Sequence, residues 1–466
     1  MKEMIVLYPA PSTVHIVAMV ELGKLILHHH HHHFSVTLII PSDTLDNTTS
    51  TTSILNQISQ TIPNSLTLHH LPSLSSFSLS KNMDPTTFAF QLIHLNDQNL
   101  LHFLSLSKTT TVVRSLIAIP PSAIHVASQL NIPFYYFYPS NASSLSFFFY
   151  LPTLHNQTSK SFKEISNSTL DHLPGLPPLL ASQLPEPILN RDTQIYKEFL
   201  HFSGNLSKAK GIIVNTFDSL EPKPIKAIAD GLCAPDLQTP PRVYSIGPLI
   251  KGFDDDNRTV DIKPECLTWL DHQPSRSVVY LCFGRKGKFS ATQFMEIATG
   301  LEMSGQRFLW VVRLDPSSDL LLPDGFLDRT EDMGLVVTSW VPQVDILSHE
   351  SVGGFVTHCG WNSVLESVCA GVPMLAWPLY AEQKLNRVVL VEEEMKLAMA
   401  MEESEDGFVS SAEVEKRVRT LMESDEGRAL REKSWKMREK ALAAWEQGGS
   451  SLVNFTELTE SWKQGS

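Results

Sequence analysis

The stretch from Trp340 to Gln383 ends an apolar, strand-like run and opens a helix within a few residues. The run GGFVTH ends at His358, and Asn362 and Ser363 begin the helical pattern. The first N–H groups of a helix have no partner within it, and the helix dipole gives them positive potential. Gly360 has no Cβ, so a ligand could approach the backbone closely there. This arrangement predicts a diphosphate-binding site at the start of the helix.

Three further side chains of this stretch could hold the rest of a nucleotide sugar. Glu366 lies one turn into the helix, where its carboxylate could accept hydrogen bonds from a ribose diol. Trp340 offers a flat face for a base, and Gln383 offers partners for sugar hydroxyls. Taken alone, a tryptophan or a histidine here would more often be a packing residue. Their combination in one stretch favours a binding site.

His15 is a candidate general base. It follows the first apolar run of the chain, in YPAPSTVHIV, where a helix begins. An imidazole can take a proton from an attacking hydroxyl, and a carboxylate on its other nitrogen then fixes its tautomer. A lone histidine near a helix start is more often structural, so this assignment needs independent support.

Two series of short, β-rich runs must position these residues. The first contains MIVLYPAP, FSVTLIIP, VVRSLIAI and IPFYYFYP; the second contains SVVYLCFG, RFLWVVR, GLVVTSW, GGFVTH and VPMLAWP. Helical patterns between the runs are typical of a parallel sheet covered by helices. We therefore expect an α/β protein whose parts are a first lobe over residues 1–240, a linker over 241–264, a second lobe over 265–450, and a C-terminal helix over 451–466 that packs back on the first lobe.

Length and composition fit a two-domain enzyme. The chain has 466 residues, 42% hydrophobic and 19% charged, and single cores stop growing at about 300 residues. Its formal charge of -13 argues against nucleic acid as a partner, because phosphate-binding surfaces carry a basic excess. It shows neither a signal peptide nor an apolar stretch of the roughly 20 residues that cross a membrane. We expect a cytoplasmic monomer without membrane insertion.

The cysteines and the histidine run from His28 to His33 do not form an obvious metal site. The five cysteines include no C-x-x-C pair, so reduced thiols are expected rather than disulfides or a zinc site. The histidine run lies between a predicted helix and FSVTLII. A solvated turn is the favoured interpretation of this run, and a metal-binding tract is the alternative.

The whole stretch from Trp340 to Gln383 resembles the donor-binding box of plant secondary-product UDP-glycosyltransferases. The box reads W-x-P-Q…H-C-G-W-N-S…E…G-x-P…P…E/D-Q, and every fixed position is matched. The segments LYPAP…H…MVELGKLI and LPGLPP are most similar to the branch that glucosylates flavonoids, isoflavonoids and chalcones. The resemblance implies a GT-B fold, in which two Rossmann-like lobes bind acceptor and UDP-sugar donor.

The resemblance also implies a role for each donor-site residue. Trp340 would stack on uracil with Gln343 beside it, Glu366 would bind the ribose, and the diphosphate would lie at the helix start. A terminal Gln383 suggests glucose, and Trp361 in place of an arginine disfavours glucuronate. The residues expected to contact the donor are Gly284, Arg285, Trp340, Val341, Gln343, His358, Gly360, Trp361, Asn362, Ser363, Glu366, Tyr380, Glu382 and Gln383.

The sequence departs from the family at the partner of the base. The resemblance makes His15 the base and implies an aspartate about a hundred residues later, but SLIAIPPS stands where the family has ALVLDFFC. The aspartate position then falls on Ala118 or Ile119, and no acidic residue occurs from Gln98 to Lys163. We expect the usual pair to be absent, with His15 acting alone or oriented by Ser122, a backbone carbonyl or water.

A second departure follows the strand SVVYLCFG. Arg285, with Lys286 and Lys288 nearby, stands where the family commonly has a small serine. These cations could strengthen diphosphate binding, crowd the site, or point into solvent.

The predicted reaction is displacement at the anomeric carbon of UDP-glucose by a phenolic hydroxyl of a flavonoid-like molecule. The product would be a β-O-glucoside, and no metal is expected because no D-x-D pair lies near the residues expected to bind phosphate. The N-terminal half is rich in Phe and Leu, which suits a small aromatic acceptor. The alternatives are C-glucosylation of a polyphenol, a terpenoid or hormone acceptor, and a non-catalytic nucleotide-sugar binding protein.

Overall fold

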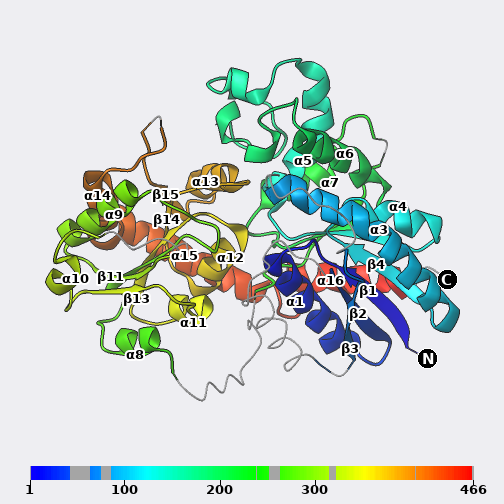
Figure 1. The fold of residues 1–466 in the computed structure, drawn as a ribbon, viewed down its shortest axis with the longest axis horizontal. Coiled ribbons are helices and arrows are strands. Elements are labelled where there is room, and N and C mark those ends of the chain that lie inside the picture. The colour runs from blue at the N-terminus through cyan, green and yellow to red at the C-terminus, as the bar shows by residue number, and fades with distance from the viewer. Residues whose placement is uncertain are drawn as a thin grey trace.

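The computed structural model describes residues 2–41, 63, 65–74, 85–237, 239–250, 263–313, 322–404 and 406–463. Within these residues the chain forms two α/β lobes, each built on a parallel sheet with helices on both faces (Figure 1). Half of the predicted linker, residues 251–262, lies outside the described residues. No described helix is long and apolar enough to cross a membrane.

The sheet of the first lobe has seven described strands in the order β3-β2-β1-β4-β5-β8-β9, and all neighbouring pairs are parallel. Its central strands are buried on both faces, which explains their continuous apolar runs. The strands are β1 (Glu3–Tyr8), β2 (Phe34–Ile40), β3 (Leu66–His70), β4 (Val113–Ala118), β5 (Phe134–Tyr138), β8 (Gly211–Val214) and β9 (Arg242–Ser245). A separate hairpin pairs β6 (Thr169–Leu170) with β7 (Leu179–Leu180).

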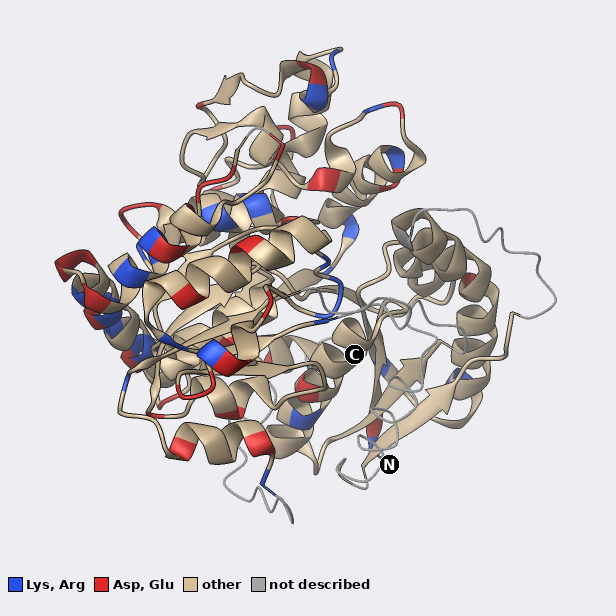
Figure 2. Ribbon diagram, turned by 60° about the vertical axis from the view of Figure 1, so that its left-hand side comes forward, with Lys and Arg blue, Asp and Glu red and all other residues tan. Residues whose placement is uncertain are grey.

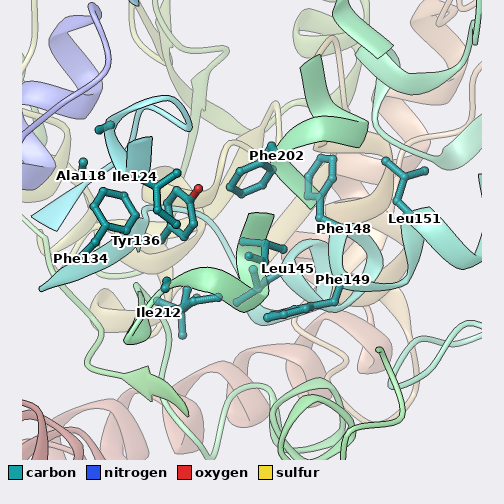
Figure 3. Close-up of a cluster of buried hydrophobic side chains, with 14 of the residues drawn as sticks. Ala118, Ile124, Phe134, Tyr136, Leu145, Phe148, Phe149, Leu151, Phe202 and Ile212 are labelled. Carbon is teal, nitrogen blue, oxygen red and sulfur yellow. The ribbon is translucent and has the colours of Figure 1, made fainter. Parts of the chain in front are cut away.

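Helices cover the two faces of this sheet unequally. The first and last helices of the chain, α1 (Thr13–His30) and α16 (Ser450–Lys463), pack on one face. The other face carries a core rich in phenylalanine and leucine (Figure 3). The helices over that core are α3 (Pro85–Thr110), α4 (Ala123–Gln129), α5 (Ala142–Gln157), α6 (Gln194–Asn205) and α7 (Pro222–Ala229), with short 3-10 turns at Phe162–Ile165, Ala181–Gln183, Glu186–Ile188 and Leu206–Lys208.

The sheet of the second lobe has six described strands in the order β12-β11-β10-β13-β14-β15, again all parallel. They are β10 (Val278–Cys282), β11 (Arg307–Val311), β12 (Gly334–Val337), β13 (Val352–Thr357), β14 (Met374–Ala376) and β15 (Ala398–Ala400). The helices are α8 (Glu265–Asp271), α9 (Ala291–Ser304), α10 (Phe326–Arg329), α11 (Gln343–Leu347), α12 (Trp361–Ala370), α13 (Gln383–Val391), α14 (Ser411–Glu423) and α15 (Asp425–Ala443). α12 packs against α15 on one face, and α9 packs against α14 on the other.

The border between the lobes differs from the prediction at one strand. Arg242–Ser245, assigned to a linker beginning at residue 241, forms β9 and pairs with β8 at the edge of the first sheet. Four residues behind a Pro-Pro pair are too few for a strand pattern to stand out in the sequence. The first lobe therefore extends past residue 241.

Candidate active site

The predicted donor residues gather at the carboxyl ends of β10 and β13, the central strands of the second sheet. Cys282 and Thr357 are paired across these strands, so the residues that follow each strand emerge side by side. Ligands of open parallel sheets bind at this kind of edge. His358 follows β13, and Gly284 follows β10.

α12 begins with a first turn whose backbone N–H groups receive no side-chain cap. Gly360 is its N-cap residue. Cys359, just before it, adopts a left-handed backbone conformation with φ of 64°. A β-carbon is strained there, so the surrounding structure must hold this turn. This turn leads from His358 into the N-terminus of α12.

Two glycines make room for the His358 ring. A β-carbon on Gly284 would lie 2.6 Å from its Nε2 atom, and one on Gly360 would lie 2.5 Å from the same atom. The His358 side chain is only 6% exposed, and burial lowers the pKa of its imidazole to about 4. The ring is therefore neutral at physiological pH and carries a single N–H, and a hydrogen bond with the backbone of Cys282 opposes the lowering of its pKa.

A glutamine on α11 organises the polar side chains of α12. The Nε2 of Gln343 donates to Glu366 Oε2 at 2.7 Å and to Ser363 Oγ at 2.9 Å. Its Oε1 accepts a hydrogen bond of 3.2 Å from the hydroxyl of Tyr280, on β10. Burial raises the pKa of Glu366 to about 7, opposed by the hydrogen bond from Gln343. This network fixes the carboxylate predicted to bind the ribose, a role for Gln343 that the sequence did not indicate.

The predicted base-stacking residue lies at the surface. Trp340 is 65% exposed, whereas its neighbour Val341 is buried in the core of the second lobe. An indole held out from a buried backbone has a face available for a planar ligand. Asn362, in the first turn of α12, is half-buried.

Three of the residues expected to contact the donor already make hydrogen bonds within the protein. Trp361 is buried, and its Nε1 donates to the backbone oxygen of Asn215 in the first lobe at 2.7 Å. Glu382 Oε1 accepts from Ser140 Oγ at 3.0 Å. Gln383 Oε1 accepts from two backbone N–H groups, at 2.8 and 2.9 Å, which closes the turn before α13. The contacts of Trp361 and Glu382 reach the first lobe, whereas those of Gln383 stay within the second.

The loop after β10 brings a cation close to this turn. Arg285 is exposed, as are Lys286 and Lys288. Burial raises the pKa of the Tyr380 hydroxyl, and the charge of Arg285 opposes that shift, so the two side chains are close. The ring of Tyr380 also lies 6.0 Å from the ring of His358.

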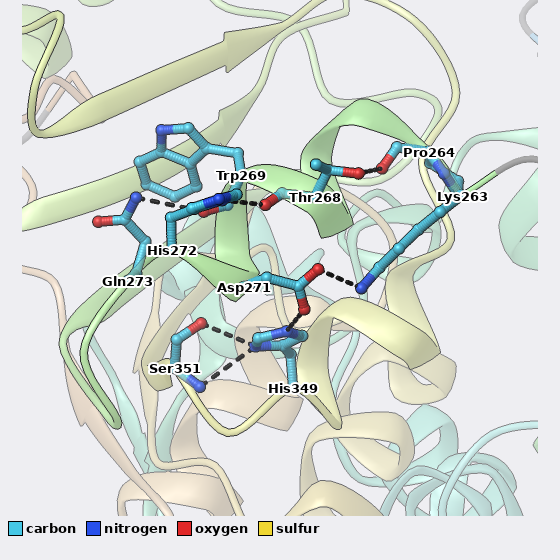
Figure 4. A network of polar contacts seen from close by, with 9 residues as sticks. All are labelled: Lys263, Pro264, Thr268, Trp269, Asp271, His272, Gln273, His349 and Ser351. Atoms are coloured by element: carbon cyan, nitrogen blue, oxygen red, sulfur yellow. Dashed lines mark hydrogen bonds and ion pairs between the residues drawn. The ribbon is translucent and has the colours of Figure 1, made fainter.

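His349, which also lies between Trp340 and Gln383, makes structural hydrogen bonds within the second lobe. His349 bonds Ser351 through Nδ1 at 2.8 Å and Asp271 through Nε2 at 3.2 Å (Figure 4). Asp271 ends α8 and also pairs with Lys263. This network ties the first helix of the second lobe to the turn before β13, and His349 is not a donor-site residue.

In the first lobe, His15 is in the first turn of α1 and is half-buried. The two positions that could have carried its aspartate are both apolar. Ala118 lies in the core beneath α3 to α7, whereas Ile119 packs towards α1. The Ile119 N–H donates to Tyr8 O at 3.0 Å, which fixes it beside the end of β1.

One carboxylate near the end of β1 was not predicted from the sequence. Asp97, on α3, accepts a hydrogen bond of 2.7 Å from Ser122 Oγ. Burial raises the pKa of the Tyr8 hydroxyl, and the negative charge of Asp97 raises it further. Asp97 therefore lies near Tyr8, the last residue of β1. Asp97 is one residue before the range that lacks acidic residues, and the pairing of α3 with the β4–α4 turn is not visible in the sequence. Ser122 therefore already donates its proton to Asp97.

Aromatic side chains lie between α3, α5 and α6. Phe199 stacks on Phe148 with ring centroids 5.2 Å apart and meets Phe90 edge-on at 5.6 Å. A cavity of about 200 Å³ opens beside them, between α3 and α6. It is lined by Thr87, Phe90, Gln91, His94, Gln194, Ile195 and Glu198.

Comparison with known proteins agrees with this arrangement. The family model described as "UDP-glucoronosyl and UDP-glucosyl transferase" matches residues 253–429. UDP-glycosyltransferase 88F4 of Malus domestica is 46% identical over 99% of this chain and 100% of its own length. Phloretin 2'-O-glucosyltransferase of Pyrus communis is 46% identical over 98% of this chain and 99% of its own length.

A solved structure of Phytolacca americana UGT2 with UDP-2fluoro-glucose and pterostilbene superposes with a TM-score of 0.88. It is 36% identical and covers 99% of this chain and 100% of that one. These findings confirm the GT-B fold and the resemblance inferred from the sequence. The chain belongs to the UDP-glucosyl transferase family and is a UDP-dependent glycosyltransferase of the plant type.

Proposed function

We propose that the protein transfers glucose from UDP-glucose to a phenolic hydroxyl of a flavonoid-like molecule with inversion. The acceptor oxygen attacks the anomeric carbon, the bond from that carbon to the β-phosphate oxygen breaks, and UDP leaves. The product is a β-O-glucoside, and the phenol proton passes to His15. The observation that carries the donor half is the start of α12, whose first turn no side chain caps and whose N-cap residue Gly360 lies against the neutral, buried His358.

The donor would lie along the network described above. Trp340 would stack on uracil, and Glu366, held by Gln343, would accept the ribose hydroxyls. The developing charge on UDP would be stabilised by the α12 dipole, His358 and the cation of Arg285. The second oxygen of Glu382 and the amide nitrogen of Gln383 would meet the glucose hydroxyls, while the Trp361 indole holds Asn215. No metal is part of this proposal.

The acceptor would lie against the aromatic side chains of α3, α5 and α6. One relative is an anthocyanidin glucosyltransferase and another a phloretin glucosyltransferase, and the Phytolacca protein was solved with pterostilbene; all three compounds are phenols with aromatic rings. Stacked and edge-on rings such as Phe148 and Phe199 suit a planar partner. These similarities support a small aromatic acceptor for this chain.

His15 would work with an isoleucine where the family has an aspartate. A phenol has a pKa of about 10, so it gives up its proton far more readily than an aliphatic alcohol. A histidine with an apolar residue at the position of the family's aspartate can then suffice. The apolar Ile119 restricts the enzyme to acidic hydroxyls in this proposal.

The experiment is mass-resolved product formation from UDP-glucose with a panel of flavonoids, isoflavones and chalcones. Acid hydrolysis of each product distinguishes an O-glucoside, which is cleaved, from a C-glucoside, which survives. The anomeric proton coupling in the NMR spectrum reports the β configuration. An acid-stable product would replace this proposal with C-glucosylation, and tight UDP binding without any product would indicate a non-catalytic binding protein.

A further inference from the structure

Two buried asparagines join the first lobe to the turn before α12, which contains Cys359. The Nδ2 of Asn141 donates to Oδ1 of Asn386 at 2.6 Å, and the Nδ2 of Asn386 donates to the backbone oxygen of Cys359 at 2.8 Å. Both asparagines have no exposed surface. Hydrogen bonds of a buried side-chain amide are strong, because no water competes for its donors and acceptor. The two bonds therefore form a continuous polar link from the first lobe to the turn before α12.

The first-lobe end of this link is fixed rigidly. Asn141 is the N-cap of α5, and its Oδ1 accepts from the backbone nitrogen of Ser144 at 2.7 Å. Glu221 is also buried there and accepts from the backbone nitrogens of Ala142 and Ser143 at 2.8 and 2.9 Å. The start of α5 thus has its backbone donors satisfied and its orientation set.

The second-lobe end of the link lies on a strained turn. Cys359 has a φ of 64° and stands between His358 and Gly360, the two residues that face the diphosphate in the proposed site. A non-glycine residue keeps this conformation only when its surroundings hold it. Asn386 is the side chain that holds its carbonyl oxygen.

The helix that carries Asn386 belongs to both lobes. Leu385 of α13 is buried in the core of the first lobe, whereas Val389 and Leu390 are buried in the core of the second. Glu382, just before this helix, bonds Ser140, just before α5. α13 therefore contacts both α5 and the Cys359 turn, so a shift of α5 would be transmitted through α13 to that turn.

We propose that Asn141 and Asn386 are a positioning pair that holds the Cys359 turn from the acceptor-binding lobe. The pair keeps the α12 start aimed at the donor diphosphate and couples donor binding to the position of α5. α5 carries Phe148 of the aromatic cluster, so the acceptor side and the donor side share one link. This inference rests on the donor site proposed above.

The test uses Asn141→Ser, Asn386→Ala and the double variant of the full-length chain. Serine is also a favoured N-cap, so Asn141→Ser keeps the α5 cap but is too short to reach Asn386. UDP affinity is measured by titration calorimetry, and KM for UDP-glucose and kcat are measured with one phenolic acceptor. We expect each single variant to bind UDP about ten-fold more weakly, equivalent to about 1.4 kcal/mol. The double variant should be no worse than Asn386→Ala, because both changes break one link.

Asn205→Ala is the matched control. Asn205 is buried in α6, and its hydrogen bonds are to His201 in the same helix. It should lower thermal stability and leave the UDP affinity and KM for UDP-glucose unchanged. A purely structural role for the pair would make Asn141→Ser behave like this control, and that result would overturn the proposal.

Glu366→Ala distinguishes failure of the link from failure of the donor site. Weaker UDP binding by Glu366→Ala with normal binding by Asn141→Ser leaves the donor site intact and rejects the link. If Glu366→Ala also binds UDP normally, the donor site itself is misplaced. Asn141→Ser alone decides the matter if Asn386→Ala does not fold.

Discussion

Burial acts on His358 and Glu366 in opposite directions, and both shifts favour the neutral form. The pKa of His358 falls to about 4, so its ring stays neutral at every physiological pH. The pKa of Glu366 rises to about 7, so its carboxylate titrates in the working range. The energetic cost of burying the charged Glu366 is absent below pH 4.5, the usual pKa of the group, and complete above pH 7.

Donor binding should therefore depend on pH through Glu366. Ribose hydroxyls donate to a carboxylate better than to its protonated form, so UDP affinity should fall as the pH drops below about 7. The advantage of wild type over Glu366→Gln should be large at pH 8 and vanish towards pH 5.5. Calorimetric titration of both proteins across this range, which cancels the titration of UDP itself, checks this. An advantage that is constant with pH would contradict it.

Gly360 should not tolerate a methyl group. The β-carbon of Gly360→Ala would lie 2.5 Å from His358 Nε2 in a site without room to move. We expect KM for UDP-glucose to rise at least ten-fold. Gly204→Ala is the control, because Gly204 lies in α6 with nothing within 4 Å of the added carbon. It should leave KM unchanged and stabilise the helix by about 1 kcal/mol. An unchanged KM for Gly360→Ala would show that His358 does not fix the site.

At the scale of elements, α16 returns from the second lobe to the first. Its Trp462 is 2% exposed and meets Phe34 and Tyr135 edge-on, with ring centroids 5.7 and 6.2 Å apart. The Ser451 hydroxyl donates to the backbone oxygen of Gly247 at 2.5 Å. The final helix is thus part of the first lobe's core. Because it follows α15 of the second lobe, the chain crosses between the lobes here as well as at the linker.

Trp462→Ala should destabilise the protein by about 3 to 5 kcal/mol, because it leaves a large cavity between α16 and the sheet. Urea unfolding followed by fluorescence measures the loss. Trp435, on α15, is 43% exposed, and Trp435→Ala should cost less than about 1 kcal/mol. Equal effects of the two substitutions would mean that α16 does not dock as described.

For the molecule as a whole, the sequence predicted what periodicity and motif spacing determine. The runs around Val278–Cys282 and Val352–Thr357 are buried on both faces, so their apolar character alone indicated parallel strands. The structure, rather than the sequence, showed that His358 and Gly284 meet at one edge of this sheet. β9 was missed because four residues are too few to show the alternation of apolar and polar residues that indicates a strand. Its pairing also depends on the rest of the sheet.

What could not be predicted are contacts between residues far apart in the sequence. Asp97 meets Ser122 through the packing of α3 on the first sheet, and the Trp361 indole reaches Asn215 across the lobe boundary. Both depend on how helices and lobes dock, which the local pattern does not encode.

The apolar Ile119 leads to a prediction about acceptor choice. Paired acceptors that carry a phenolic or an alkyl hydroxyl on the same scaffold should be glucosylated at very different rates, with the phenol preferred by at least 100-fold. Ile119→Asp should narrow this gap by raising activity on the alkyl alcohol. Initial rates with both acceptors check this, and equal rates for the wild-type protein would contradict the role given to Ile119.

The most direct test of the account compares wild type and His15→Ala with UDP-glucose and a single flavonoid across pH 6 to 9. A positioned general base contributes about 100-fold to 10,000-fold, so His15→Ala should lose at least 100-fold in kcat with KM for UDP-glucose unchanged. The residual rate should rise with pH as the phenol ionises by itself. If His15→Ala keeps the wild-type rate at pH 7, His15 is not the base and the mechanism proposed here is wrong.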